Sequence, residues 1–362
     1  MADYTTIDDP SAHFQGTEYT GSGADRSVTN AGNSDLQPDL VWIKTDSASS
    51  HMWQDSSRGV TKYLRSNLSS AEATATSVIQ AFQTDGFSLS AGGGNNVSGE
   101  VSMSWQWKAG GGSTSSNDTG DITSTLQTNS TGGFTIGTYT GNSTDNQTIA
   151  HGLGATPGLI IVKRLSGTAN WAVWHKCNTF NHILRLNMDT TETDSASGRV
   201  GAFGSQGSST IFTVFQGSSA YGNTNESGES YVFYAWKEVQ GFSKFGKYKG
   251  NGNADGAFNY TGFKPAVIIL KNYANAGYNW WIGDNQRSKF NEVDQWYFPN
   301  LNNEEFSGSG AGIDVDFLSN GFKLRTDNTG INGNGHSYMY MAWAENPFVT
   351  STDTNSIPTT AR

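Results

Sequence analysis

The sequence contains very little cysteine and few charged residues. A single cysteine, Cys177, stands among 362 residues, so no internal disulfide can form and stability has to come from packing. Charged residues make up only 15% of the chain and give a net charge of −10, with no run of lysine or arginine. Because a basic face is needed to neutralise phosphates, this composition argues against nucleic-acid binding.

Long apolar runs are also missing. The longest aliphatic runs, such as LIIV at 159–162, have the length of a strand and are too short to cross a bilayer. The opening residues, MADYTTIDDP, carry aspartates and no apolar stretch, which is unlike a secretory signal peptide. We therefore expect a protein that is made in a cytoplasm and does not insert into a membrane, and that would reach the outside of a cell, if it acts there, by lysis.

Glycine and aromatic residues are abundant instead. The chain has 44 glycines, and aromatic residues, among them 11 tryptophans, make up 12% of it. A chain this rich in large apolar rings can bury real cores, so we do not expect disorder. Glycine, serine, threonine and asparagine mixed with β-branched and aromatic residues are typical of short strands joined by tight turns.

One pattern of landmarks occurs three times along the chain. Each copy begins with a phenylalanine and a Tyr-x-Gly turn, continues with a proline-led aliphatic run that ends in lysine, and closes with a tryptophan eight residues after a glycine. These landmarks are the tyrosines Tyr19, Tyr139 and Tyr248, the lysines Lys44, Lys163 and Lys271, and the tryptophans Trp107, Trp236 and Trp343. The constant order and nearly constant spacing indicate three copies of one module.

The local patterns within a copy favour a β-sandwich. PGLIIVK at 157–163 and its counterparts are continuous apolar runs, typical of a strand buried on both faces. In SYVFYAWK at 230–237 both faces carry bulky residues, which predicts a core on one side and a second packing surface on the other. For the alanine-rich segment 69–82 we expect a loop with at most one helical turn, because its counterparts are rich in glycine and serine. The predicted fold is all-β, with three tandem antiparallel β-sandwich modules of jelly-roll type.

The landmarks divide the chain into six segments. An N-terminal arm covers 1–13, module 1 covers 14–109, module 2 covers 133–239, module 3 covers 240–347, a linker covers 110–132, and a C-terminal tail covers 348–362. The linker starts with glycine and serine, while DITSTLQ at 121–127 alternates and is a candidate strand. Modules 2 and 3 follow one another directly, so we expect them to pack rigidly together.

Several longer segments carry a family resemblance. They are MADYTTIDDP at the start, GLGATPGLIIVK at 152–163, EVQGFSKFGKYKGNGNADGAFNYTGFKPA at 238–266, DFLSNGFKLRT at 316–326 and MYMAWAENPF at 339–348. Over nearly the whole chain, they resemble a module of uncharacterised virion proteins of marine tailed phages, including phages of cyanobacteria and Pelagibacter. The resemblance implies a structural protein of a phage virion, and it defines no catalytic residue.

This resemblance leads to an expected function without chemistry. We expect a surface-displayed virion protein, either a tail fibre or tail accessory protein that binds the host surface, or alternatively a capsid decoration (cement) protein. Its partners would be other virion proteins and host surface glycans, and we expect a homo-oligomer with no cofactor and no metal.

Four tryptophans are candidate glycan ligands: Trp53, Trp171, Trp280 and Trp281. A flat apolar ring in contact with solvent suits the C–H face of a sugar. However, tryptophan recurs near the same point of each module, so core packing is the favoured interpretation. Trp281 is the best exposed candidate, because neighbours on a strand point to opposite faces and Trp280 and Trp281 cannot both face one core.

Two charged patterns are weaker candidates for ligand sites. The Asp-x-x-Arg sequences at 55–58 and 284–287 could bind a carboxylate or a phosphate, but a structural ion pair is favoured because module 2 lacks the arginine. The loop GNGNADG at 250–256 could ligate calcium, yet the equivalent loop at 20–26 offers few oxygen donors, so turn chemistry is the better interpretation.

A polysaccharide depolymerase is the less favoured function. It would need two carboxylates that face one cleft, and the best pair is Asp314 and Asp316, which share one face of an expected strand. The histidines show no metal or triad spacing with Cys177 or a serine. We therefore expect that the protein is not an enzyme.

Overall fold

The computed structural model describes residues 5–179, 182–194, 208–216, 224–308 and 312–350, which form an all-β structure. The only helix among these residues is one short 3-10 turn, η1, at Pro10–Ala12. Every pair of named strands is antiparallel, for example β1 with β9 and β22 with β28. The predicted antiparallel all-β fold is thus confirmed. No helix in the described ranges is long and apolar enough to cross a membrane.

The same order of four strands occurs in each of the three modules. In module 1 it is β1 (Phe14–Thr20), β9 (Val101–Trp107), β3 (Leu40–Thr45) and β4 (Met52–Asp55). In module 2 it is β12 (Phe134–Thr140), β19 (Ser230–Trp236), β14 (Leu159–Arg164) and β15 (Ala172–His175). In module 3 it is β20 (Ser243–Lys249), β28 (Ser337–Pro347), β22 (Phe263–Asn272) and β23 (Trp280–Asp284). We call these the large sheets. Each proline-led run forms the third strand of its large sheet.

A smaller sheet covers the outer face of each large sheet. In module 1 it contains β2 (Arg26–Val28), β8 (Phe87–Leu89) and β7 (Ile79–Phe82), and in module 3 it contains β21 (Phe258–Tyr260), β27 (Gly321–Leu324) and β26 (Val315–Leu318). In module 2 it is the pair β13 (Gln147–Ala150) and β18 (Ile211–Val214). Two further short pairs are β5 (Lys62–Tyr63) with β6 (Ala73–Thr74), and β24 (Gln295–Trp296) with β25 (Phe306–Ser307).

Additional strands extend the large sheet of module 2 on both sides. The segment expected to be a linker carries β10 (Ser115–Asn117) and β11 (Ser124–Asn129), and β11 pairs with β12. The alternating residues that suggested a strand there overlap β11. On the other side the sheet continues with β16 (His182–Arg185) and β17 (Thr193–Asp194). The alanine-rich segment 69–82 contains β6 and β7 and no helical turn.

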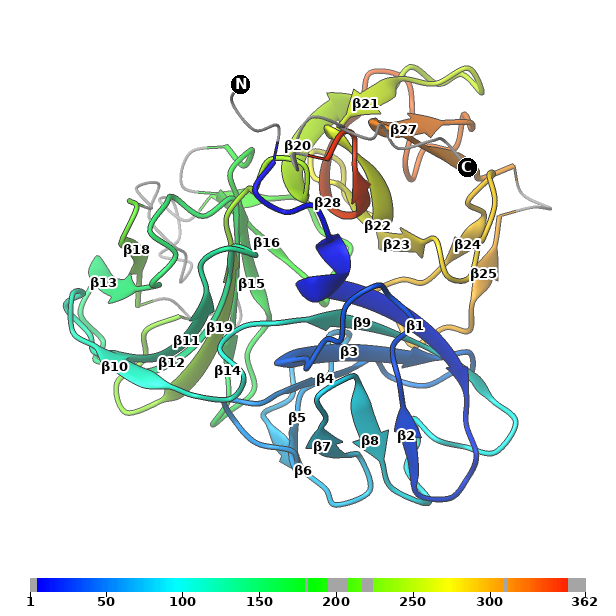
Figure 1. The fold of residues 1–362 in the computed structure, drawn as a ribbon. Coiled ribbons are helices and arrows are strands. Elements are labelled where there is room, and N and C mark those ends of the chain that lie inside the picture. Colours follow the sequence, from blue (N-terminus) through cyan, green and yellow to red (C-terminus); the bar gives the residue numbers. More distant parts are fainter. Residues whose placement is uncertain (1–4, 180–181, 195–207, 217–223, 309–311, 351–362) are drawn as a thin grey trace.

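The three modules surround a common centre, with the large sheets inside and the smaller sheets at the periphery (Figure 1). Strand β19 shows why both of its faces are apolar. Its Tyr231, Phe233 and Ala235 belong to the core inside module 2, whereas Val232, Tyr234 and Trp236 belong to the core between the modules. The predicted packing of this strand on two surfaces is confirmed.

The closing tryptophans of the three modules meet at this centre. The ring centroids lie 5.9 Å apart for Trp107 and Trp236, 5.2 Å apart for Trp107 and Trp343, and 5.8 Å apart for Trp236 and Trp343. All three side chains are buried. Since residues far apart in the sequence form one triangle of rings, the first and last modules are in contact and the modules close into a ring with one shared core.

Candidate functional site

The four tryptophans considered as glycan ligands are all buried. Trp53, Trp171 and Trp280 lie in the central core, and Trp281, the residue expected to be the most exposed, is only 7% exposed. Its ring packs edge-on against Trp296 and Phe298, with centroid distances of 5.7 and 4.7 Å. The expected exposure of Trp281 is therefore wrong, because Trp296 of β24 and Phe298, which follows this strand, cover it. The favoured interpretation of core packing holds for all four.

The register of the sheets also corrects which of these residues are equivalent. In the sheet register, His51, Trp171 and Trp280 lie opposite the lysine that ends the proline-led run of their module, and Trp53 lies two residues after His51. Each of the three donates to a backbone carbonyl of a neighbouring module. Trp171 Nε1 lies 3.0 Å from Arg65 O, Trp280 Nε1 lies 2.9 Å from Arg185 O, and His51 Nε2 lies 3.0 Å from Phe298 O.

The histidine in module 1 is held in one tautomer by its neighbours. Trp42 Nε1 donates to His51 Nδ1 over 2.9 Å, so the proton of the neutral ring sits on Nε2 and points to the carbonyl of Phe298. Burial, with the charge of Lys44 nearby, holds the pKa of His51 well below its usual range. The histidine thus replaces an indole N–H donor at this module junction.

The recurring lysines end at the same junctions. Lys163 Nζ donates to Arg164 O (2.7 Å) and to Ser69 O of module 1 (3.4 Å), and Lys271 Nζ donates to Tyr278 O (2.7 Å) and to Asp189 O of module 2 (3.4 Å). Lys44 Nζ lies 5.0 Å from the centre of the Tyr297 ring of module 3. Burial lowers the pKa of Lys163 to about 7 and the pKa of Lys44 and of Lys271 to about 8.

The Asp-x-x-Arg sequences form buried ion pairs, as favoured from the sequence. Arg58 Nε lies 2.6 Å from Asp55 Oδ2, and Tyr234 of module 2 donates its hydroxyl to the same carboxylate over 2.7 Å. Arg287 Nη2 lies 2.6 Å from Asp284 Oδ2, and its guanidinium lies over the ring of Trp105 of module 1. These charges are used to join modules and are closed to a ligand.

Module 2 replaces the ion pair with neutral groups at the same two positions. His175 stands where the other modules have aspartate and Asn178 where they have arginine, and His175 Nε2 lies 3.2 Å from Tyr340 O of module 3. Burial lowers the pKa of His175 to about 4, so the ring is neutral at physiological pH. The junction of modules 2 and 3 is therefore stabilised by a neutral hydrogen bond, whereas the other two junctions contain an ion pair.

A buried asparagine in each module was missed in the sequence. Asn96, Asn225 and Asn332 stand three residues before the glycines Gly99, Gly228 and Gly335, and their side chains bridge to the Tyr-x-Gly loop. In module 3, for example, Asn251 N donates to Asn332 Oδ1 over 3.0 Å. The glycine of the loop has no room for a side chain, since a Cβ at Gly250 would lie 2.3 Å from Gly333 O. The constant Asn-x-x-Gly spacing is the signal that could have revealed these residues.

The acidic candidates lie at the surface of modules 1 and 3. The carboxylate of Asp255 pairs with Lys323, and in module 1 Asp25 accepts a hydrogen bond from Ala91 N over 2.6 Å. Asp314 and Asp316 flank the buried Val315 and so share one face, as predicted, with Arg325 Nε 3.6 Å from Asp316 Oδ2. In the described part of the chain, no group of three or more His, Cys, Asp or Glu side chains could hold a metal ion.

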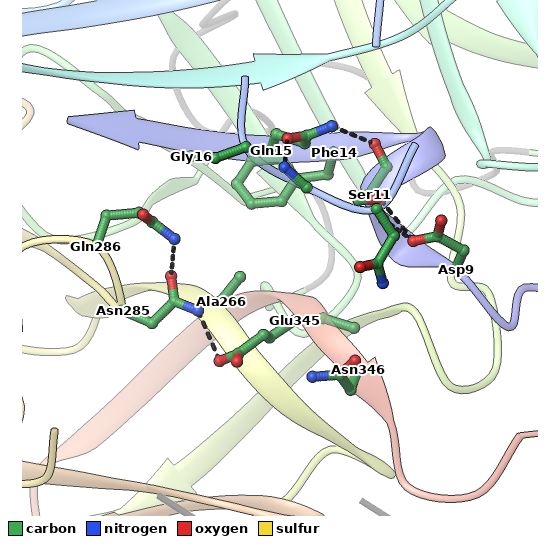
Figure 2. A pocket seen from close by; sticks show the side chains of 14 residues that line it. Asp9, Ser11, Phe14, Gln15, Gly16, Ala266, Asn285, Gln286, Glu345 and Asn346 are labelled. Carbon is green, nitrogen blue, oxygen red and sulfur yellow. Dashed lines mark hydrogen bonds between the residues drawn. The ribbon is translucent and has the colours of Figure 1, made fainter. Parts of the chain in front are cut away.

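A cleft of about 340 Å³ opens where modules 1 and 3 meet (Figure 2). One wall comes from the end of the arm and the start of β1, with Asp9, Ser11 and Gln15. The other wall comes from β22, β28 and the loop after β23, with Asn285, Gln286 and Glu345. At the junction of modules 1 and 2, β11 fills the equivalent space, and Gln127 Nε2 donates to Ser56 Oγ over 2.8 Å.

Hydrogen bonds within each wall hold the polar groups of the cleft in place. Asn285 Nδ2 donates to Glu345 Oε2 over 2.6 Å and Gln286 Nε2 donates to Asn285 Oδ1 over 3.1 Å. On the opposite wall, Gln15 Nε2 donates to Ser11 O and to Ser34 O, over 3.0 and 2.7 Å. The lining thus contains amides, two carboxylates and a hydroxyl beside the ring of Phe14 and several alanines and glycines, and its polar groups can hydrogen-bond a ligand.

Comparison with known proteins identifies one family. The model of the family described as "Domain of unknown function (DUF7483)" matches residues 9–347, which span all three modules. No curated protein and no solved structure matches the chain.

Proposed function

The chain belongs to the DUF7483 family, and we propose that it is a structural protein of a phage virion, displayed on the particle surface as a tail fibre or tail accessory protein that binds the host. The observation that carries this proposal is that the charged and aromatic side chains that recur in all three modules are used to pack the modules together. Such a body presents its outer loops and small sheets rigidly, which suits attachment. The resemblance of the long segments to virion proteins of marine tailed phages supports the same role.

The arm favours the tail over a capsid decoration protein, the alternative function. A decoration protein would use its arm to bind the shell. Here Ile7 is buried in the central core, and Thr5 Oγ1 donates to Gln240 O at the start of module 3 over 2.6 Å. Residues 5–12 therefore lie against the protein itself, so this part of the arm is not free to reach a capsid subunit.

The copy number per virion tests the proposal. Quantitative mass spectrometry of purified particles, with the major capsid protein as internal reference, should find a few copies to a few dozen copies per particle. A copy number close to that of the capsid subunits would support decoration of the shell instead. Absence of the protein from purified particles would overturn the virion role.

A polysaccharide depolymerase is the remaining candidate, and Asp314 is the observation in its favour. Partial burial, with the negative charges of Glu292, Asp294 and Asp316 nearby, raises the pKa of Asp314 to about 6, as a general acid requires. Release of reducing ends from host polysaccharide, abolished by Asp314→Asn, would establish this activity. We expect no release, because Arg325 already pairs with Asp316.

A further inference from the structure

All exposed aromatic side chains among the described residues belong to module 3. They are Phe258 (45% exposed), Tyr260 (56%) and Phe290 (79%). Phe258 and Tyr260 lie two residues apart on β21, and the buried Asn259 between them points inward, so both rings stand on the outer face of the small sheet. This sheet lies at the periphery of the molecule, away from the other modules (Figure 1).

The internal repeat shows that the fold does not need these rings. In module 1 the residue opposite Phe87 is Val28, and in module 3 the residue opposite Phe322 is Asn259, so Ser27 and Thr29 occupy the positions of Phe258 and Tyr260. A structural role would be shared by both copies. Exposed aromatic rings that occur in only one of the two modules are better explained by ligand binding. A ring exposed to water contributes little to packing, and the free energy that its burial would provide is not used for folding.

Phe258 packs against a glycine on the neighbouring strand. A Cβ added at Gly321 would lie 2.8 Å from Cε2 of Phe258, so the ring rests directly on the backbone of β27. One face of the ring is thereby packed while part of it is exposed to solvent. A ring that is already oriented loses little side-chain entropy when a ligand stacks on it.

Charged groups of both signs accompany the two rings on the same face. Across the sheet, Phe258 is followed by its partner Lys323 and then by Asp316. Lys323 Nζ pairs with Asp255 Oδ1, and Arg325 Nε lies 3.6 Å from Asp316 Oδ2. We call Phe258, Tyr260, Gly321, Lys323 and Asp316 the aromatic face. Within this face the positive charge of Lys323 is balanced by the negative charge of Asp316. A polyanion would need an excess of positive charge.

We infer that the aromatic face binds a neutral saccharide, with sugar rings stacked on Phe258 and Tyr260 and hydroxyl groups bonded to Lys323 and Asp316. A sugar is apolar on its C–H face and polar at its rim, which matches this arrangement. The sheet has three strands of three or four residues, so its face measures roughly 10 Å by 10 Å. A stable protein interface needs about 800 Å² per partner, which is several times larger.

The inference rests on the proposed function in that it names the ligand through which the protein would bind its host. Its test uses the full-length protein alone and so does not depend on the location of the protein in a virion. Native gels that contain dextran, mannan, galactomannan or hydroxyethyl cellulose measure the retardation of the protein by each neutral polysaccharide.

We expect at least one polysaccharide to retard the natural protein, and F258S/Y260T to weaken that binding at least tenfold. Because this variant carries the residues of module 1, it should fold. The matched control, Ser27→Ala with Thr29→Ala, alters the equivalent face of module 1 and should leave binding unchanged. Absence of retardation in all four gels, or equal retardation of F258S/Y260T, would overturn the inference. Sedimentation that shows dimers for the natural protein and monomers for F258S/Y260T would assign the face to self-association instead.

Discussion

The residues of the large sheets at the centre are similar in all three modules, whereas those of the small sheets at the periphery differ from module to module. At the centre, each module contributes a tryptophan to the same triangle of rings and a buried lysine to a junction with its neighbour. At the periphery, module 3 exposes Phe258 and Tyr260 where module 1 has Ser27 and Thr29. The comparison teaches that residues shared by the copies maintain the fold, whereas residues found in one copy are the ones to examine for function.

Removal of a central ring should have the largest effect. Trp236→Ala should lower the free energy of unfolding by about 4 kcal/mol, because it opens a cavity where all three modules meet. Phe290→Ala, which removes an exposed ring, should change it by less than about 0.5 kcal/mol. Urea unfolding followed by circular dichroism measures both. Equal effects of the two substitutions would break the distinction between centre and periphery.

The second effect concerns the buried ion pair of module 1, Asp55 with Arg58, at the junction with module 2. Arg58→Asn should cost about 3 kcal/mol, because it leaves the carboxylate of Asp55 buried without its partner. The double variant D55H/R58N introduces the residues of module 2, His175 and Asn178, and should recover part of that loss. Urea unfolding can compare the natural protein, the single variants Asp55→His and Arg58→Asn, and the double variant. A double variant less stable than Arg58→Asn would show that the two junctions are not interchangeable.

The buried lysines should make stability depend on pH. Burial lowers the pKa of Lys163 to about 7 and of Lys44 and Lys271 to about 8, below their value in the unfolded chain. The unfolded chain then binds more protons, so stability should rise between pH 7 and pH 9, by up to about 1.4 kcal/mol per pH unit for each lysine. Urea midpoints at the two pH values measure this rise.

Replacement of one lysine gives the control for this prediction. Lys163→Met removes one of the three titrating groups, so its urea midpoint should rise less between pH 7 and pH 9 than that of the natural protein. A midpoint that stays constant or falls in the natural protein over this range would contradict the lowered pKa values of these buried lysines.

The smallest effect is expected on the aromatic face. F258S/Y260T should change the free energy of unfolding by less than about 0.5 kcal/mol, since both rings are exposed and module 1 folds with serine and threonine at these positions. Differential scanning calorimetry can compare its melting temperature with that of the natural protein. A decrease of several degrees would mean that Phe258 and Tyr260 stabilise the fold. Their occurrence in module 3 alone would then no longer indicate a role in binding.

The strands were predictable because their patterns are local. The proline-led runs at 38–44, 157–163 and 265–271 became β3, β14 and β22, and the alternating segment 230–237 became β19 with its two packed faces. Hydrophobic periodicity reports which faces are covered, so the existence of a second packing surface could be inferred. It does not report which element provides the cover, and the closure of the ring between modules 1 and 3 was therefore not foreseen.

The candidate site was less accessible from the sequence. The equivalence of His51 with Trp171 and Trp280 was missed because the loop before them grows by one residue in each module, so counting from the lysine fails without the sheet register. The burial of Trp281 depends on Trp296 and Phe298, which approach only through tertiary folding. Exposure is likewise a tertiary property, and Phe258 and Tyr260 did not stand out among the many aromatic residues of the chain.

The cooperativity of unfolding tests the shared core most directly. Equilibrium urea unfolding of the full-length protein can be followed in parallel by tryptophan fluorescence, which reports on the central rings, and by far-ultraviolet circular dichroism, which reports on all strands. If the three modules form one body around Trp107, Trp236 and Trp343, both signals should change in a single coincident transition. Separate transitions for fluorescence and circular dichroism would mean that the modules unfold one by one, and the account of a common core would be contradicted.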